Sequence, residues 1–465
     1  MVSLKKVIAG FMAAGIVIVP QVVGAAVSAD EAKALGTTLT KFGAEQSGNA
    51  DGSIPAYTGG LSNVPGHTSD SRFYIDPFAE EKPVLKIDAS NIGQYDSMLT
   101  EGTKEAIKRF PESFNVQVYK THRTMRYPDW VLENTLKNAT TAKLGGQVEG
   151  DAVIGADEGE NAFPGIPFPI PKNGYEVMWN HQFRYQPPVQ HTIPQAFLID
   201  TNGGVSRIAT PDEYFLRPWY EKSGELRKLS FGALHGFTST LLDPPSSAGI
   251  VFLNYYMANS EQKVWFYTPG QRRVRAAPEF AYDIPIASYG GVLLWDEIHG
   301  FTGRMDRFDF KLMGKKEMYV PYNVFGITNT KKSEEFIGKK HANPDTVRFE
   351  KRRVYVVEAT RKAEARHVYS KRRFYVEEDC WCIVSSESYD DSGALWRMGH
   401  IYAFPTYDLG GIDVNAWGFV DFIKGNYFLV NLGRGEDGRL SKSYESHRDL
   451  KMKLTPQSVA SGSVR

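Results

Sequence analysis

The sequence has few cysteines, no net charge and no long apolar run after its first thirty residues. Only two of the 465 residues are cysteines, so a disulfide framework does not hold a chain of this size together. Lysine and arginine together number 54, and so do aspartate and glutamate. The chain therefore has no overall excess of positive charge that would attract nucleic acid. No later segment is long and apolar enough to cross a membrane as a helix. With 42% hydrophobic and 23% charged residues, the composition is that of a globular protein.

The sequence also lacks the short motifs of common catalytic sites. It contains no nucleophile elbow, phosphate-binding loop, zinc-binding helix motif or glycine-rich dinucleotide turn. We therefore predict no catalytic residue, no metal and no cofactor, and we interpret the protein as a non-enzyme.

The histidines show no metal-ligand spacing. His181 and His191, or His235 and His299, could meet in space, although a single histidine in a β-rich protein is more often structural. A group of carboxylates could bind calcium, but its spacing does not match an EF-hand loop, and nearby cations favour ion pairing. The carboxylates are Asp296, Glu297, Asp306 and Asp309.

Cys380 and Cys382 flank Trp381. In a strand these positions lie about 6.6 Å apart on one face, near the upper limit for a disulfide, so a bond requires a local kink. A redox pair or a copper(I) or zinc site would be the functional alternative, but further ligands are missing nearby. We favour two buried or half-buried residues that can oxidise.

A set of basic residues is predicted to form a stripe on the solvent face of adjacent strands. The stripe would either dock a partner or lipid headgroups, or be a solvated face that protects sheet edges. The residues are Lys351, Arg352, Arg353, Arg361, Lys362, Lys371, Arg372 and Arg373.

The N-terminus is typical of a cleavable signal peptide. Two lysines precede an uncharged apolar run from Val7 to Val19, and Gly24-Ala25-Ala26 supplies small residues for cleavage. The run is shorter than the roughly 20 residues that span a bilayer. An uncleaved anchor is the alternative, and Pro20 argues against it. We predict a signal peptide over residues 1–26 and a location in the periplasm, at most peripheral to the outer membrane.

Residues 27–200 are predicted to form a helical and loop-rich part that packs on a sheet. Helices are expected at 28–42, 91–109 and 128–140. The Pro/Gly-rich segment 152–173 cannot pair as a central strand, and we expect it to be an ordered, exposed connector.

Strand-like runs follow one another from about Val205. Tyr, Phe and Trp make up 13% of the chain and 43 glycines accompany them, which indicates strands and turns. Short polar turns between the runs favour antiparallel pairing of consecutive strands. Strands are expected at 251–258, 262–267, 272–276, 316–320, 347–359, 367–377, 382–388, 394–402 and 427–431.

These patterns predict a β-rich α+β fold. Too few helices follow residue 200 to cover a flat sheet, so we expect residues 201–445 to form a strongly curved antiparallel half-barrel with helices and loops on its concave face. Residues 446–465 are predicted to be a flexible tail.

The interior of this half-barrel would be aromatic. It either binds an apolar ligand or simply fills the core, and the register of each strand decides which side chains face it. The predicted ligand-binding residues are Tyr255, Trp265, Tyr267, Tyr319, Tyr355, Phe374 and Trp396.

Several stretches resemble the family of unknown function DUF1329. They are Val264–Arg275, Asp306–Asp309, Gly314–Asn323 and Tyr375–Arg397, and the resemblance extends from about residue 30 to 445. The family commonly has another residue around Cys380, so the cysteine pair is particular to this branch.

The resemblance carries expectations about fold and role. DUF1329 is similar in fold to LolA and LolB, in which a curved antiparallel sheet holds acyl chains against a helical lid. Its genes tend to lie beside those of an outer-membrane protein and an RND-type exporter. The resemblance thus implies handling of a hydrophobic molecule with these two partners, and it assigns no catalytic residue.

The favoured hypothesis is a periplasmic carrier of a lipid or other hydrophobic molecule, acting in envelope transport or outer-membrane biogenesis. A hydrolase of a lipid-like substrate is one alternative, and it would need a histidine and a carboxylate within hydrogen-bond reach in the cavity. A bridging assembly factor is another, and it predicts a filled core and a large exposed apolar patch.

Overall fold

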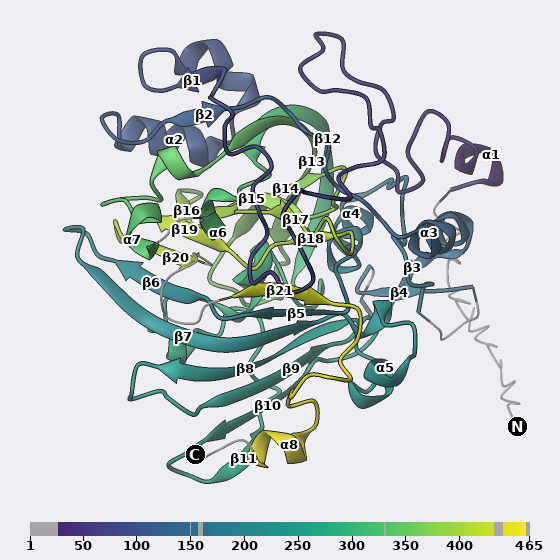
Figure 1. Cartoon of the computed structure of the whole chain (residues 1–465), viewed down its shortest axis with the longest axis vertical. Helices are drawn as coiled ribbons and strands as arrows, with labels where there is room; N and C mark the ends of the chain where they lie inside the picture. The colour runs from purple at the N-terminus through teal and green to yellow at the C-terminus, as the bar shows by residue number, and fades with distance from the viewer. Residues whose placement is uncertain (1–26, 149, 157–160, 330–331, 432–439, 462–465) are drawn as a thin grey trace, which may run out of the picture.

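The structure, a computed structural model, describes residues 27–461 except 149, 157–160, 330–331 and 432–439. The predicted signal peptide lies outside the described residues. The described chain has the predicted β-rich α+β fold and is built around one large open sheet (Figure 1). None of its helices combines the length and the hydropathy that crossing a membrane requires.

The large sheet runs from β11 at one end to β12 at the other, with neighbouring strands antiparallel. In spatial order its strands are β11 (Arg273–Ala276), β10 (Lys263–Thr268), β9 (Val251–Tyr256), β8 (His235–Asp243), β7 (Val205–Leu216), β6 (Gln195–Ile199), β20 (Tyr427–Asn431), β19 (Trp417–Asp421), β16 (Leu395–Ile401), β15 (Ile383–Tyr389), β14 (Lys371–Glu377), β13 (Phe349–Arg361) and β12 (Phe308–Pro321).

Shorter strands extend the sheet. β5 (Val189–Thr192) pairs with the second half of β7 and carries β21 (Ser441–Tyr444) on its other side. β1 (Leu85–Ile87) and β2 (Val116–Val118) join the end of β13 through one parallel pair. The sheet is therefore mixed, although almost entirely antiparallel.

The predicted pairing of consecutive strands is confirmed. Strands β6 to β11 pair in chain order, as do β12 to β16. The sheet also includes strands from before residue 201, because β6 lies between β7 and β20. The strong curvature of a half-barrel stays a prediction.

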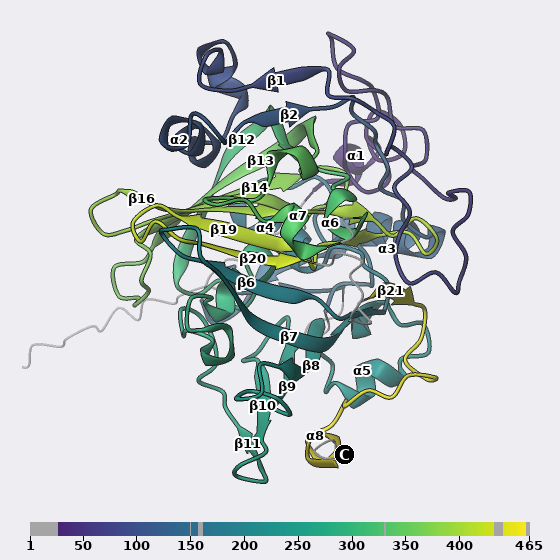
Figure 2. The ribbon, with the colours of Figure 1, turned by 60° about the vertical axis from the view of Figure 1, so that its left-hand side comes forward.

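The helices are short and lie around the sheet (Figure 2). They are α1 (Ala29–Ala32), η1 (Ile92–Met98), α2 (Glu101–Arg109), α3 (Asp129–Thr141), α4 (Gly174–Gln182), η2 (Pro218–Tyr220), α5 (Glu225–Leu229), η3 (Ala287–Tyr289), η4 (Trp295–Gly300), α6 (Gly326–Asn329), α7 (Ser333–Phe336), η5 (Pro344–Thr346) and α8 (Pro456–Ser461). Two further hairpins pair β3 (Lys143–Gly145) with β4 (Ala152–Ile154), and β17 (Phe404–Pro405) with β18 (Ile412–Asp413).

The helices predicted at 91–109 and 128–140 are confirmed, whereas α1 is shorter than the predicted 28–42. Ser28 caps α1 in a capping box with Glu31, each side chain accepting a hydrogen bond from the other's backbone N–H. Beyond α1, Leu35 forms an isolated bridge with Leu39, and Gly36 between them has the left-handed φ of +82°, so the helix does not continue towards residue 42.

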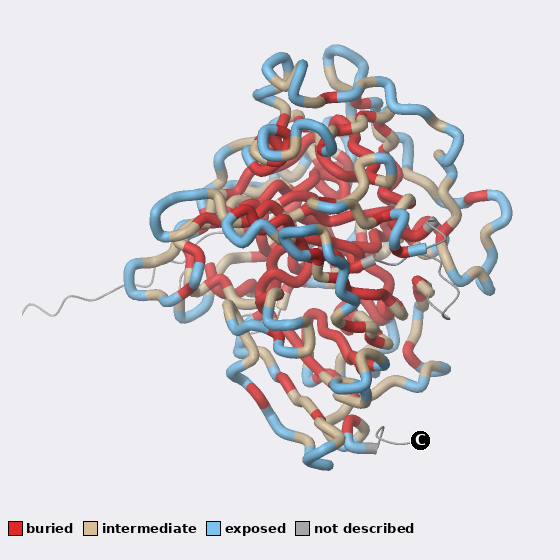
Figure 3. The backbone as a smooth tube through the Cα atoms, turned by 90° about the vertical axis from the view of Figure 1, so that its left-hand side faces the viewer, coloured by how far each residue is buried: buried red, intermediate tan, exposed pale blue. Residues whose placement is uncertain are grey.

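The main hydrophobic cluster fills the space between the sheet, α4 and the connection from β11 to β12. Burial is concentrated in the middle of the molecule, with exposed loops around it (Figure 3). The core therefore depends on segments far apart in sequence.

The prediction that segment 152–173 is exposed is wrong. Ile166 and Phe168 are fully buried. The Asn138 side chain donates to the Ile166 carbonyl, and the Asn180 amide makes two hydrogen bonds with the Phe168 backbone. These side-chain amides form hydrogen bonds with backbone groups that the proline-rich segment leaves unpaired, and the segment can therefore be buried.

The predicted basic stripe is also wrong, because none of its eight residues is exposed. Arg352 and Arg372 are each 1% exposed. Arg352 pairs with Glu377 and Asp379 at 2.7 Å, and Arg372 pairs with Asp296 at 2.8 Å. Asp296 belongs to η4, far from β14 in sequence, so strand periodicity alone could not reveal this neutralisation.

Residues 446–461 belong to the segment for which the sequence predicts a flexible tail. They carry α8, which contacts β9, β10 and β11. Leu454 and Val459 are buried in a hydrophobic cluster with Tyr255 and Tyr267.

Candidate functional site

An apolar cavity of about 40 Å³ lies between the sheet and residues 285–298, which we call the cover segment. Its walls come from β7, β8, β9, β19 and β20. The lining residues are Glu213, Phe215, Phe237, Ser239, Phe252, Ile286, Ser288, Tyr289, Leu293, Trp295, Ile298, Trp417 and Val430.

Strand alternation explains this lining. Phe237 and Ser239 are two residues apart on β8, as are Glu213 and Phe215 on β7, so each pair faces one side of the sheet. Trp295 of η4 stacks on Phe237 with ring centroids 6.1 Å apart. The cavity is therefore a gap in aromatic packing.

The cover segment is a compact loop. A bridge between Pro285 and Leu294 closes its first part into a loop, and the Ile286 N–H donates to the Leu293 carbonyl at 2.8 Å. Tyr289 donates its hydroxyl to Glu213 at 3.3 Å, and its ring lies 6.2 Å from that of Phe428. The Tyr289 side chain thus reaches across to the strands that it covers.

Glu213 is the acidic group of the cavity. Burial raises its pKa to about 7, although hydrogen bonds from Ser239 and Tyr289 oppose that rise. Near neutral pH this carboxyl is divided between its neutral and charged forms.

Three of the seven predicted ligand-binding residues lie together, but on the other face of the sheet. Tyr255, Trp265 and Tyr267 belong to the cluster under α8, and the Tyr255 hydroxyl donates to the Leu454 carbonyl at 2.8 Å. On β9 it is Phe252 that lines the cavity, and Tyr255 is an odd number of residues away.

The other four predicted residues are dispersed. Tyr355 stacks on Trp381 at 5.1 Å and Phe374 packs edge-on against Phe301 at 5.6 Å, both within the main cluster. Tyr319 lies 6.1 Å from Tyr95, and Trp396 lies 5.2 Å from Tyr369. None of the seven lines the apolar cavity.

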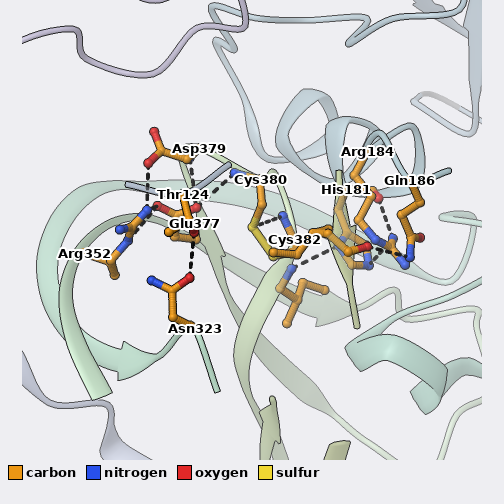
Figure 4. The surroundings of a disulfide bond; sticks show 12 residues. Thr124, His181, Arg184, Gln186, Asn323, Arg352, Glu377, Asp379, Cys380 and Cys382 are labelled. Carbon is orange, nitrogen blue, oxygen red and sulfur yellow. Dashed lines mark hydrogen bonds and ion pairs between the residues drawn. A yellow bond between two sulfur atoms is a disulfide. The ribbon is translucent and has the colours of Figure 1, made fainter. Parts of the chain in front are cut away.

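Cys380 and Cys382 form a disulfide, and both are fully buried (Figure 4). The kink that such a bond requires is present, because Trp381 between them has φ +54°. The Trp381 ring N–H donates to the Phe42 carbonyl at 2.9 Å, which fixes the indole in the core. The pair is therefore a buried structural bond.

The four predicted carboxylates are paired separately. Asp296 contacts Arg372 and His367; burial opposes its ionisation, but the Arg372 charge and the hydrogen bond with His367 hold its pKa at about 2. Glu297 pairs with Arg397 at 2.7 Å. Asp306 accepts from Tyr282, and Asp309 lies 3.8 Å from Lys362. Within the described ranges, no three histidine, cysteine or acidic side chains are arranged to hold a metal ion.

The histidine pairs are only partly brought together. His191 lies apart and contacts Asp212 at 2.7 Å. By contrast His181, His235 and His299 surround two buried arginines, Arg184 and Arg217, which belong to none of the predicted sites. An arginine in an otherwise uncharged run is the one signal that could have drawn attention to them.

The chain is similar to several known proteins. An uncharacterized protein of Pseudomonas aeruginosa is 37% identical over 446 residues, 95% of each chain. A structure of a putative outer membrane lipoprotein-sorting protein domain from Vibrio parahaemolyticus aligns with TM-score 0.40 and 12% identity, covering 62% of this chain and 98% of the other.

A DUF1329 family protein from Desulfovibrio piger aligns with TM-score 0.37 and 16% identity, covering 60% of this chain and 98% of that one. The family model described as a protein of unknown function, DUF1329, matches residues 86–460. This match confirms the resemblance, and the chain therefore belongs to the DUF1329 family.

Proposed function

We propose that this protein is a non-enzymatic carrier of a lipid or another hydrophobic molecule in the cell envelope. The observation that supports the proposal is the aromatic cavity beneath the cover segment. An apolar cavity stays dry and favours apolar groups, because burying them releases about 25 cal/mol per Å².

The cavity as observed is too small for such a ligand. Its 40 Å³ has room for a few atoms, whereas ligand sites usually measure about 300 Å³ or more. Binding therefore requires the cover segment to move away from β7, β8 and β20. Tyr289 is the side chain whose contacts with Glu213 and Phe428 would have to break.

The chemistry of the lining favours binding over hydrolysis. Among the described residues that line the cavity, the ionisable groups are Glu213 and Tyr289, and no histidine is present. The histidine–carboxylate pairs of the described chain, such as His367–Asp296 and His191–Asp212, lie outside this lining. A hydrolase of a lipid-like substrate gains no support from this arrangement.

Location and partners belong to the same proposal. The export signal predicted in residues 1–26 supports a location of the mature protein in the periplasm. An RND-type exporter and an outer-membrane protein are the partners that the family's gene neighbourhood suggests.

The direct test is native mass spectrometry with solvent extraction of protein purified from periplasm. We expect a co-purifying hydrophobic adduct of defined mass. A ligand-free mass that persists after incubation with long-chain lipids would refute the carrier.

A cavity-filling substitution tests the location of the site. Ser288 lines the cavity and its hydroxyl has no hydrogen-bond partner, so Ser288→Leu should fill the cavity without breaking a bond and should weaken ligand retention about tenfold or more. Ala287→Leu, at the exposed neighbouring position, is the matched control and should leave retention unchanged. Equal retention by both variants would place the ligand elsewhere.

A further inference from the structure

Two arginines in the interior have no acidic partner. Arg184 is 2% exposed and Arg217 is 4% exposed. No carboxylate of the described residues forms an ion pair with either guanidinium. Arg352 shows the usual arrangement: it lies on the other side of the disulfide and pairs with Glu377 and Asp379 (Figure 4). Buried charges are normally paired with an opposite charge, so Arg184 and Arg217 are exceptional.

Their observed partners are the end of a helix and an amide. Arg184 donates to the His181 carbonyl at 2.6 Å, and Arg217 donates to the Gln182 carbonyl at 3.4 Å and to the Gln186 side chain. His181 and Gln182 are the last residues of α4, whose C-terminus offers about half a negative charge. Two positive charges therefore remain largely uncompensated.

The surrounding histidines are neutral and supply no negative charge. His181 accepts the Ile383 N–H on Nδ1 and donates from Nε2 to the Phe301 carbonyl, so it carries one proton. Burial, reinforced by the arginines, lowers the pKa of His181, His235 and His299.

One hydrogen-bond donor in this cluster is left without an acceptor. Arg184 Nε is buried and has no partner among the described residues. His299 accepts from Arg184 on Nδ1 at 3.3 Å, so its proton sits on Nε2, and its side chain is hydrogen-bonded to that of Asn415. An unmade bond to a buried donor is costly, which indicates a missing acceptor beside Arg184.

The cluster adjoins the apolar cavity. Glu213 and Phe215 of β7 line the cavity, and Arg217 directly follows Leu216, the last residue of that strand. Ile298 also lines it, and the next residue is His299, whose ring lies 5.0 Å from that of Phe215. A chain bound in the cavity would therefore end beside the two arginines.

We propose that Arg184 and Arg217 bind the acidic group, a carboxylate or a phosphate, of an amphiphile whose apolar chain occupies the cavity. The inference rests on the proposed carrier function and adds the chemical class of its ligand. Guanidinium groups match these anions because their parallel N–H groups form paired hydrogen bonds with two oxygens. The competing explanation is that the arginines only cap α4.

The test compares three ligands with the same chain on the full mature protein: oleate, an oleoyl glycerol phosphate and oleyl alcohol. Calorimetric titration should show oleate or the phosphate, or both, binding at least about tenfold more tightly than the alcohol, and their relative affinity identifies the acid. Arg217→Met and Arg184→Met should each abolish this preference. Arg373→Met, which removes an arginine paired with Glu358, should preserve it.

Thermal unfolding without ligand separates the two explanations. If the arginines await an anion, Arg217→Met removes an uncompensated buried charge and should raise the Tm; if they only cap α4, it should lower the Tm. Equal affinities of the acids and the alcohol would overturn this inference and leave the carrier standing. Binding of none of the three would overturn the carrier and this inference together.

Discussion

Glu213 shows how one buried side chain can link the stability of this protein to pH. It sits in the apolar cavity with no cation beside it, and burial raises its pKa to about 7 from 4.5 in an exposed glutamate. Because the folded state holds the proton more tightly than the unfolded state, this group lowers the stability progressively as pH rises from 4.5 to 7. Below 4.5 both states are protonated and the effect disappears.

We expect Glu213→Gln to remove this dependence. The amide keeps an oxygen for the Tyr289 hydroxyl and carries no charge, so at pH 8 the variant should be more stable by up to about 3 kcal/mol, and at pH 4 it should match the wild type. Urea unfolding at pH 4, 6 and 8 measures the difference. Glu80→Gln, at an exposed position, is the control, and identical pH profiles of both variants would contradict the assigned burial.

At the scale of elements, the β9–β10 hairpin determines which aromatic residues face the interior. Phe252 faces the cavity, whereas Tyr255, Trp265 and Tyr267 face outward and would be exposed without a cover. The C-terminal segment supplies that cover through Leu454 and Val459 of the α8 region. The segment after residue 445 thus has a structural role in burying the outer face of the hairpin.

Val459→Asp tests this role. The substitution places a carboxylate at a fully buried position, and we expect a loss of about 3 kcal/mol or more in the free energy of unfolding. Ala460→Asp, the adjacent exposed position, should change stability by less than about 0.5 kcal/mol. Denaturant titration of both variants provides the measurement; a mobile tail would give the same small effect for each.

At the scale of the whole molecule, the sheet joins the two halves of the chain. β6, from residues before 201, pairs with β7 on one side and with β20 on the other. Without β6 the strands β7–β11 would be separated from β12–β20, and both new edges would expose unpaired backbone groups.

We therefore expect a fragment of residues 201–445 not to fold alone. The full mature chain should unfold in one cooperative transition by calorimetry, whereas the fragment should show no such transition and should aggregate. A folded fragment with dispersed amide signals in its NMR spectrum would show instead that the two halves are independent domains.

The sequence by itself determined the class of fold and most of the strands. Alternating β-branched and aromatic residues between short polar turns placed β9, β10, β11, β13 and β16 within a few residues, because strand period and turn chemistry are local properties. The family was equally visible, since its motifs are contiguous stretches such as Gly314–Asn323.

Only the tertiary structure decided which residues meet. The register of β9 points Tyr255 away from the cavity. A shift of one residue in strand register moves every side chain of that strand to the opposite face of the sheet. The basic residues of β13 and β14 became buried because acids from η4 and from the end of β14 reach them. Arg184 and Arg217 are equally buried, yet no acid of the described chain reaches them. Charge pairing depends on distances between segments far apart in sequence, and only the fold sets those distances.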